Sequence, residues 1–382
     1  MRYLFLFLSG VSFQTAFAQY HTQAKNIVDS LTSQTYWGRG YTQDGLEKAA
    51  GFISRKFNEY GLTPMAQNTF FQEFSHPVNT FPGKMELEVN GKTLMPGIDF
   101  IVSPESRGIR HSGKFERLDS ASYIDRKNRF ILQISEKLTW SVATEVADYT
   151  AVNVKASALS EMPEKYKVKI DQSFVPQFAA KNVTGFVRGT LFPDSVILIT
   201  AHYDHLGGMG ADTYFPGAND NASGVALLLC LANYYAQHPA KFSIAFICFA
   251  GEEAGLLGSK YYTEHPIIPL KHIRFLWNTD LAGTGEEGIT VVNATEFPME
   301  FDMLKNMNQQ HQYLKNIMPR GKAANSDHYF FTELGVPGFF FYTMGGSPAY
   351  HDVQDVANNI SLLEIDDLIQ LILRFNEKLM HP

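Results

Sequence analysis

The sequence is poor in cysteine. Its 382 residues include only two, Cys230 and Cys248. Two thiols cannot form a zinc-ribbon site, which needs four ligands of this kind. Both cysteines lie in apolar segments that read as a helix interior and a strand, and this pairing rarely offers the geometry of a disulfide. An exported protein could form one, but we expect two buried free thiols.

The chain also lacks runs of basic residues, long apolar segments, internal repeats and low-complexity stretches. Charged residues make up 19% of the sequence, and the formal charge of −7 argues against nucleic acid as a partner. No apolar run reaches the length of a comfortable membrane span. A hydrophobic content of 45% is typical of a globular protein. The length predicts two domains, or one large domain with an insertion.

Residues 1–18 have the features of a secretory signal peptide. Arg2 provides a positive start, residues 3–13 are mostly apolar, and residues 16–18 (Ala-Phe-Ala) form a small-x-small cleavage site before Gln19. No cysteine follows that would support a lipid anchor. We therefore expect an exported protein, either periplasmic or secreted.

Hydrophobic periodicity divides the remainder into three parts, 19–78, 79–180 and 181–382. The first part predicts helices, and the third alternates buried strands with helices. This alternation predicts an α/β fold with a mixed, mostly parallel sheet and helices on both faces. The middle part has several prolines, short strand-like pieces and the hairpin signal Asn90-Gly91. It predicts an inserted, mostly β domain, to which we assign no chemistry because it shows no cluster of metal-ligand residues.

Metal-ligand residue types follow the predicted strands of the third part. The apolar run 243–250 ends at Gly251 and is followed by two adjacent carboxylates. The full set is His202, Asp220, Glu252, Glu253, Asp280 and His351. In open α/β sheets ligands bind at the carboxyl ends of the strands. Imidazoles and carboxylates gathered there suit two divalent metal ions that share a water. Asp204 is placed two residues after His202, where it could orient that imidazole.

The same residues carry a resemblance to a known family. The chain resembles the M28 family of co-catalytic zinc peptidases, which includes bacterial aminopeptidases. The matching segments are His202-Tyr203-Asp204, 217–224 (Gly-Ala-Asn-Asp-Asn-Ala-Ser-Gly), 251–253, 278–280, 326–328 (Ser-Asp-His), 350–351, 38–40 and 61–64. Residues 79–180 resemble a degenerate protease-associated domain at the usual place of insertion, and 19–78 with 181–382 then form the peptidase domain.

The resemblance implies a role for each site residue. Asp220 would bridge two zinc ions and be followed by a cis peptide bond. His202 and Asp280 would complete one zinc site, and Glu253 and His351 the other. Glu252 would be the general base and not a ligand. Residues that would contact ligands or substrate are Asp204, Asp327, His328 and Asp355. We expect no role for His205.

These features predict a zinc exopeptidase acting on peptides, in the first place an aminopeptidase. Three alternatives stay open at this point. The same fold could carry a glutaminyl cyclase-like reaction with one zinc, or a carboxypeptidase or dipeptidase activity. A decayed peptidase scaffold could also serve as a binding protein without catalysis. The sequence predicts neither the side-chain preference nor the oligomeric state.

Overall fold

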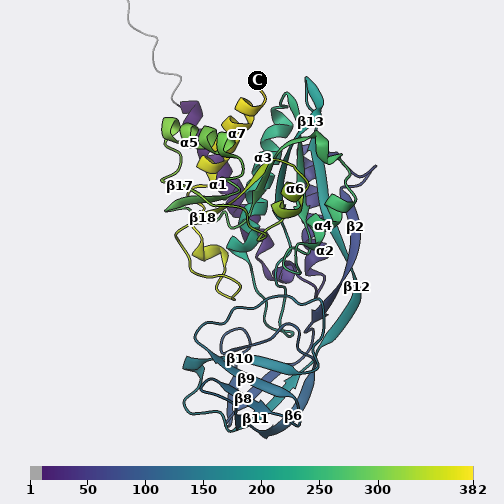
Figure 1. Ribbon diagram of the computed structural model, residues 1–382, viewed down its shortest axis with the longest axis vertical. Helices are drawn as coiled ribbons and strands as arrows, with labels where there is room; N and C mark the ends of the chain where they lie inside the picture. The colour runs from purple at the N-terminus through teal and green to yellow at the C-terminus, as the bar shows by residue number, and fades with distance from the viewer. Residues whose placement is uncertain (1–10, 382) are drawn as a thin grey trace, which may run out of the picture.

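The computed structural model describes residues 11–381, with side chains from Tyr20 onward. Figure 1 shows two units, an α/β unit and a smaller β unit beneath it, connected by a long ribbon of two strands. The ribbon consists of β2 (Phe71–Thr80) and β12 (Ser173–Val187), which pair antiparallel. Strand β12 belongs to this ribbon and continues across the predicted boundary at 181 without a break. The division of the chain at 79 and 181 therefore stays a prediction.

The first helix, α1 (Val11–Leu31), runs through the expected cleavage point after residue 18. The first ten residues of the predicted signal peptide lie outside the described residues, and its removal stays a prediction. No helix between residues 11 and 381 is long and apolar enough to cross a membrane.

The central sheet of the α/β unit is mixed, as predicted. Its four middle strands are parallel neighbours: β14 (Phe242–Phe249), β13 (Phe192–His202), β15 (Ile273–Thr279) and β18 (Gly338–Met344). Antiparallel pairs flank them, β12 on β14 and β16 on β18. The outer strands are β1 (Thr63–Pro64), β16 (Gly288–Val292) and β17 (Ile317–Pro319). The parallel centre brings four carboxyl ends to one edge.

Helices cover both faces of this sheet. One face shares a hydrophobic core with α1, α2 (Gly45–Tyr60), α3 (Gly224–Gln237), α5 (Pro298–His311) and α7 (Ile365–Leu379). The other face packs against α4 (Leu257–Glu264) and α6 (His328–Glu333). Short helical turns lie at η1 (Gln34–Arg39), η2 (Ala156–Ala158), η3 (Ala218–Ser223), η4 (Leu270–His272) and η5 (Ala357–Asn359).

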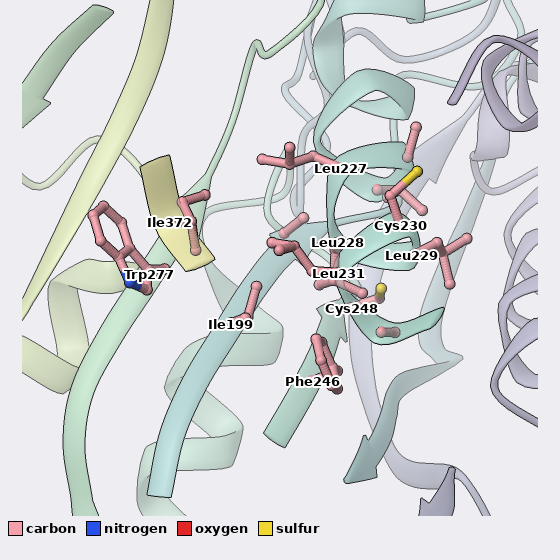
Figure 2. Packing of buried hydrophobic residues seen from close by; sticks show 14 of the residues in the cluster. Ile199, Leu227, Leu228, Leu229, Cys230, Leu231, Phe246, Cys248, Trp277 and Ile372 are labelled. Carbon is pink, nitrogen blue, oxygen red and sulfur yellow. The ribbon is translucent and has the colours of Figure 1, made fainter. Parts of the chain in front are cut away.

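Helix α3 lies at the centre of the larger core. It is apolar around most of its circumference, because it is enclosed between the sheet and neighbouring helices (Figure 2). Cys230 on α3 and Cys248 on β14 are both buried and free, which confirms the expectation of two unpaired thiols. The core therefore needs no cross-link to hold α3 against the strands that carry the site.

The β unit consists of two sheets. One has the order β5-β10-β9-β8-β7 and the other β4-β3-β11-β6. Their bounds are β3 (Met85–Val89), β4 (Lys92–Leu94), β5 (Phe100–Val102), β6 (Ile109–Lys114), β7 (Glu116–Arg117), β8 (Ser122–Asp125), β9 (Phe130–Ser135), β10 (Thr150–Lys155) and β11 (Lys165–Ile170). Asn90 and Gly91 both have positive φ and join β3 to β4, which confirms the hairpin.

The core of the β unit includes side chains from outside it. Leu206, Met209 and Phe215 belong to the segment after β13, yet they are buried in the same cluster as the strands of the β unit. The β unit is thus packed onto the very segment that connects His202 to Asp220.

Candidate metal centre

The predicted ligand residues meet at the carboxyl edge of the four parallel strands. His202 is the last residue of β13, and Asp280 directly follows β15. Glu252 and Glu253 come after β14, and His351 lies in the loop after β18. Asp220 lies in the turn η3, directly before α3. Strand ends and one helix start therefore position all six side chains.

Asp220 lies between two histidines. Its Oδ1 is 3.3 Å from Nε2 of His202, and its Oδ2 is 3.0 Å from Nε2 of His351. Each carboxylate oxygen thus faces a different imidazole, which is the arrangement needed to share one carboxylate between two metal ions. The peptide bond between Asp220 and Asn221 is cis, as the family resemblance implies.

Each histidine has a second carboxylate neighbour. Nε2 of His202 lies 3.1 Å from Oδ1 of Asp280, and Nε2 of His351 lies 3.2 Å from Oε2 of Glu253. Two groups of residues could each hold a metal ion, because the donor atoms within each group all lie within 4.8 Å of one another. One group includes Glu252. The groups are His202, Asp220 and Glu253, and His202, Glu252 and Asp280. Imidazole nitrogens and carboxylate oxygens in this number fit zinc.

The two adjacent glutamates differ in their electrostatics. Burial raises the pKa of Glu252 well above its usual value; His202 acts to lower it, and the charges of Asp280, Glu253 and Asp327 act to raise it further. Burial and Asp220 also act to raise the pKa of Glu253, but His351 and His205 outweigh them and lower it to about 2. Glu253 is therefore held as a carboxylate, and Glu252 has the higher affinity for a proton.

Asp204 acts mainly on the backbone of the two glutamates. Its carboxylate accepts hydrogen bonds from the N–H groups of Glu252, at 3.2 Å, and Glu253, at 3.3 Å. Nδ1 of His202 lies nearer to the Asp204 carbonyl oxygen, at 3.2 Å, than to its carboxylate, at 3.7 Å. Asp204 thus holds His202 through its main chain, and its side chain positions the Glu252-Glu253 turn.

Asp355 holds the loop of Asp220 and not His351. Its carboxylate accepts the backbone N–H of Asn219 at 2.8 Å and that of Asp220 at 3.0 Å. Its carbonyl oxygen accepts the N–H of Ala218 at 3.0 Å. One aspartate therefore fixes three successive residues of the turn that presents Asp220.

The segment with Asp327 and His328 lies buried behind the centre. Ser326 donates to Oδ2 of Asp280 at 3.1 Å and accepts from Asn278 at 2.8 Å. Burial raises the pKa of Asp327 to about 7 and lowers that of His328 to about 4. The solvent-accessible surface of both side chains is close to zero, so the predicted substrate contact stays a prediction.

Sequence analysis missed His205. Its side chain is fully buried, and its Nδ1 lies 2.7 Å from Oε1 of Glu253. Because Glu253 is a carboxylate and can only accept, Nδ1 is the donor. A second histidine three residues after His202 was the available signal, but one histidine beside a motif is usually uninformative. The structure gives it a role in orienting Glu253.

Arg39 was noted only as part of a matching segment. Its guanidinium is fully buried and donates to five backbone carbonyl oxygens, of Tyr203, Leu31, Pro216, Gly217 and Asp220. Burial lowers its pKa to about 10, against the opposing charges of Asp220, Asp355, Asp204 and Glu253. Arg39 thus ties the N-terminal segment to the turn of Asp220 and places one cation beneath an acidic site.

Comparison with known proteins agrees with this geometry. The sequence model of peptidase family M28 matches residues 182–376. Aminopeptidase YwaD of Bacillus subtilis is 30% identical over 188 residues, which is 46% of this chain and 40% of that protein. A probable zinc metalloprotease of Pyricularia oryzae is 36% identical over 111 residues, 28% of this chain and 22% of that protein. The matched segments thus span less than half the length of these curated relatives.

Solved structures share the fold over nearly the whole chain. A peptidase M28 precursor from Shewanella amazonensis has a TM-score of 0.69 at 16% identity, covering 97% of both chains. The zinc aminopeptidase BSAP from Bacillus subtilis has a TM-score of 0.67 at 17% identity, covering 94% of both chains. At these identities the likeness establishes the fold alone.

Proposed function

The chain belongs to peptidase family M28, and we propose that it is a co-catalytic zinc exopeptidase that removes N-terminal residues from peptides. One observation carries the proposal. The two oxygens of Asp220 face Nε2 of His202 and Nε2 of His351, so that one carboxylate can serve two metal ions. The names of the aminopeptidase and zinc metalloprotease relatives support the same reaction class.

The donor set supports two zinc ions. His202 and Asp280 would hold one ion, Glu253 and His351 the other, and Asp220 both. When bound, such a pair lowers the pKa of a water between the ions and polarises the scissile carbonyl group. Cobalt or manganese would also fit these ligands chemically. We propose zinc because it prefers imidazole ligands together with carboxylates.

Glu252 is the side chain suited to moving the proton. In the proposed reaction water attacks the peptide carbonyl carbon, and the Glu252 carboxylate accepts the proton that the water loses. The C–N bond then breaks, and Glu252 returns the proton to the departing amine. Burial and neighbouring carboxylates raise the pKa of Glu252 in the metal-free chain, and two bound cations would lower it again, toward the range that suits a group that both accepts and returns a proton. Glu252 also lies close enough to His202 and Asp280 to bind the same metal ion as a ligand. Its role as the general base is therefore part of the proposal.

The proposed metal centre favours a substrate with a free α-amine. The lone pair of a neutral amine could bind one zinc ion beside the carboxylates of Asp220, Glu253 and Asp280, whereas an acetylated amine has no such lone pair. This preference supports cleavage at the N-terminal end over a carboxypeptidase action. The presence of candidate ligands for both ions supports hydrolysis over a one-zinc cyclase reaction.

A panel of matched peptides tests the proposal. Peptides with free and with acetylated N-termini, and with free and amidated C-termini, are incubated with the zinc-loaded protein. Release of the first residue only from peptides with a free N-terminus is the expected result. Metal analysis of the same sample should give about two zinc ions per chain, and cleavage that persists after chelation would contradict the proposal.

We further propose that the protein is exported, on the basis of residues 1–18. Fractionation of the native host followed by N-terminal sequencing tests this directly. A mature protein outside the cytoplasm that begins at Gln19 is the expected outcome.

A further inference from the structure

Trp140, in the segment of the β unit between β9 and β10, forms two hydrogen bonds with His351. The N–H of Trp140 donates to the carbonyl oxygen of His351 at 2.9 Å, and Nδ1 of His351 lies 2.9 Å from the carbonyl oxygen of Trp140. A carbonyl oxygen only accepts, so Nδ1 carries the proton. When His351 binds a metal ion as a neutral ring, its lone pair is then on Nε2, which faces Asp220 and Glu253.

Trp140 is itself held firmly in the β unit. Its indole N–H donates to the carbonyl oxygen of Val102 on β5 at 2.8 Å. Its ring stacks on Phe215, with centroids 4.7 Å apart and planes inclined by 26°. Because the side chain is anchored at both its edge and its face, the main chain that meets His351 has a fixed position.

The hydrophobic core of the β unit also holds the segment that leads from His202 to Asp220. Phe215 lies between His202 and Asp220 in the sequence, and Met209 of that segment accepts the N–H of Val102 at 3.3 Å through its sulfur. Both are buried among strands of the β unit. One hydrophobic core therefore fixes the segment before Asp220 and, through Trp140, the loop of His351.

We propose that the β unit completes the half of the metal centre formed by Glu253 and His351, with Trp140 as the positioning residue that sets the tautomer and orientation of His351. The inference rests on the proposed binding of zinc by these residues. The partner of a metal-ligating histidine at its other nitrogen commonly contributes about 10- to 100-fold to metal affinity. Here the partner is a main-chain carbonyl of a different unit, so the β unit acts on the site without contributing a ligand.

Zinc affinity of the Trp140→Gly variant tests the proposal. This change removes the stack on Phe215 and the bond to Val102, so the main chain at residue 140 can leave His351. Zinc binding to the full chain is measured by competition with a chromophoric chelator, which resolves two dissociation constants. The dissociation constant of the ion held by Glu253 and His351, which is the one lost in His351→Ala, should rise about 10-fold or more, and that of the other ion should stay within about threefold.

A double-mutant cycle separates positioning from general loosening. In a His351→Ala background the same half of the centre is already lost, so Trp140→Gly should have no further effect on the remaining ion. Phe130→Ala serves as a matched control, because Phe130 is a fully buried aromatic of the β unit whose ring contacts are with Phe115 and Tyr166. It should lower stability and leave both affinities unchanged.

The outcomes distinguish this inference from the proposed function. A wild-type chain that binds no zinc contradicts the proposed function. A wild-type chain that binds two ions, with both affinities unchanged in folded Trp140→Gly, overturns the inference alone. If Trp140→Gly does not fold, Trp140→Phe takes its place. It keeps the stack, loses the bond to Val102, and should weaken the same ion by about threefold, whereas unchanged binding overturns the inference.

Discussion

His205 donates a hydrogen bond of 2.7 Å from Nδ1 to Oε1 of Glu253, and both side chains are almost completely buried. The other oxygen of Glu253 faces His351. Glu253 therefore has one oxygen committed to a fixed donor and one directed at the centre. The hydrogen bond from His205 keeps the Glu253 carboxylate in a single orientation. Without it, the flexible side chain could adopt several orientations.

Replacing His205 by alanine should weaken zinc binding. Without its donor, Glu253 is free to rotate away from the metal centre, and the loss should be about 10- to 100-fold in affinity for one ion. Chelator competition measures the change. His238→Ala, at the exposed histidine that follows the C-terminal end of α3, is the control and should bind zinc as the wild type does. Equal affinities in the two variants would show that His205 only fills space.

Glu252→Gln should retain zinc and lose turnover. The amide has nearly the same shape but cannot accept the proton of the attacking water, and general base catalysis contributes about 10²- to 10⁴-fold. Turnover of an N-terminal aminoacyl dye and zinc content are measured on the same preparation. Glu264→Gln, at an exposed glutamate of α4, is the control. If Glu252→Gln lost an ion together with its activity, Glu252 would be a ligand.

Asp220→Ala should lose metal, and zinc content measured on the purified variant checks this.

Replacing Arg39 by lysine should destabilise the protein although the charge is kept. Lysine has three donors, against five in the guanidinium, so at least two of the buried carbonyl oxygens would lose their partner. An unsatisfied buried polar group costs about 1–3 kcal/mol, and a loss of about 3 kcal/mol or more is expected. Urea unfolding of the zinc-free protein measures it. Arg55→Lys, at an exposed position of α2, should change stability by less than about 0.5 kcal/mol.

His328 should make the protein less stable in acid. Burial lowers its pKa from about 6.5 to about 4, so between these values the unfolded chain binds a proton that the folded chain does not. Stability therefore rises with pH across this window, by up to about 3 kcal/mol from this group. In His328→Leu this part of the slope should disappear, as measured by urea unfolding of zinc-free protein from pH 4 to 7. His238→Leu should keep the slope of the wild type.

Local patterns were enough to predict much of the fold. Alternating apolar strands and helices predicted the α/β sheet, and four strands do lie parallel at its centre with helices on both faces. Asn90 and Gly91 predicted their turn because both adopt positive φ at little cost.

The sequence by itself determined which ligand residues were available, because each follows a strand or precedes a helix, and parallel strands bring their carboxyl ends to one edge. Only the tertiary structure decided what holds them. His205 orients Glu253, Asp355 holds the turn of Asp220, and Trp140 meets His351 from 211 positions away. Such partners are main-chain groups or single side chains brought together by packing. A backbone carbonyl has no residue identity, so no pattern in the sequence can indicate it.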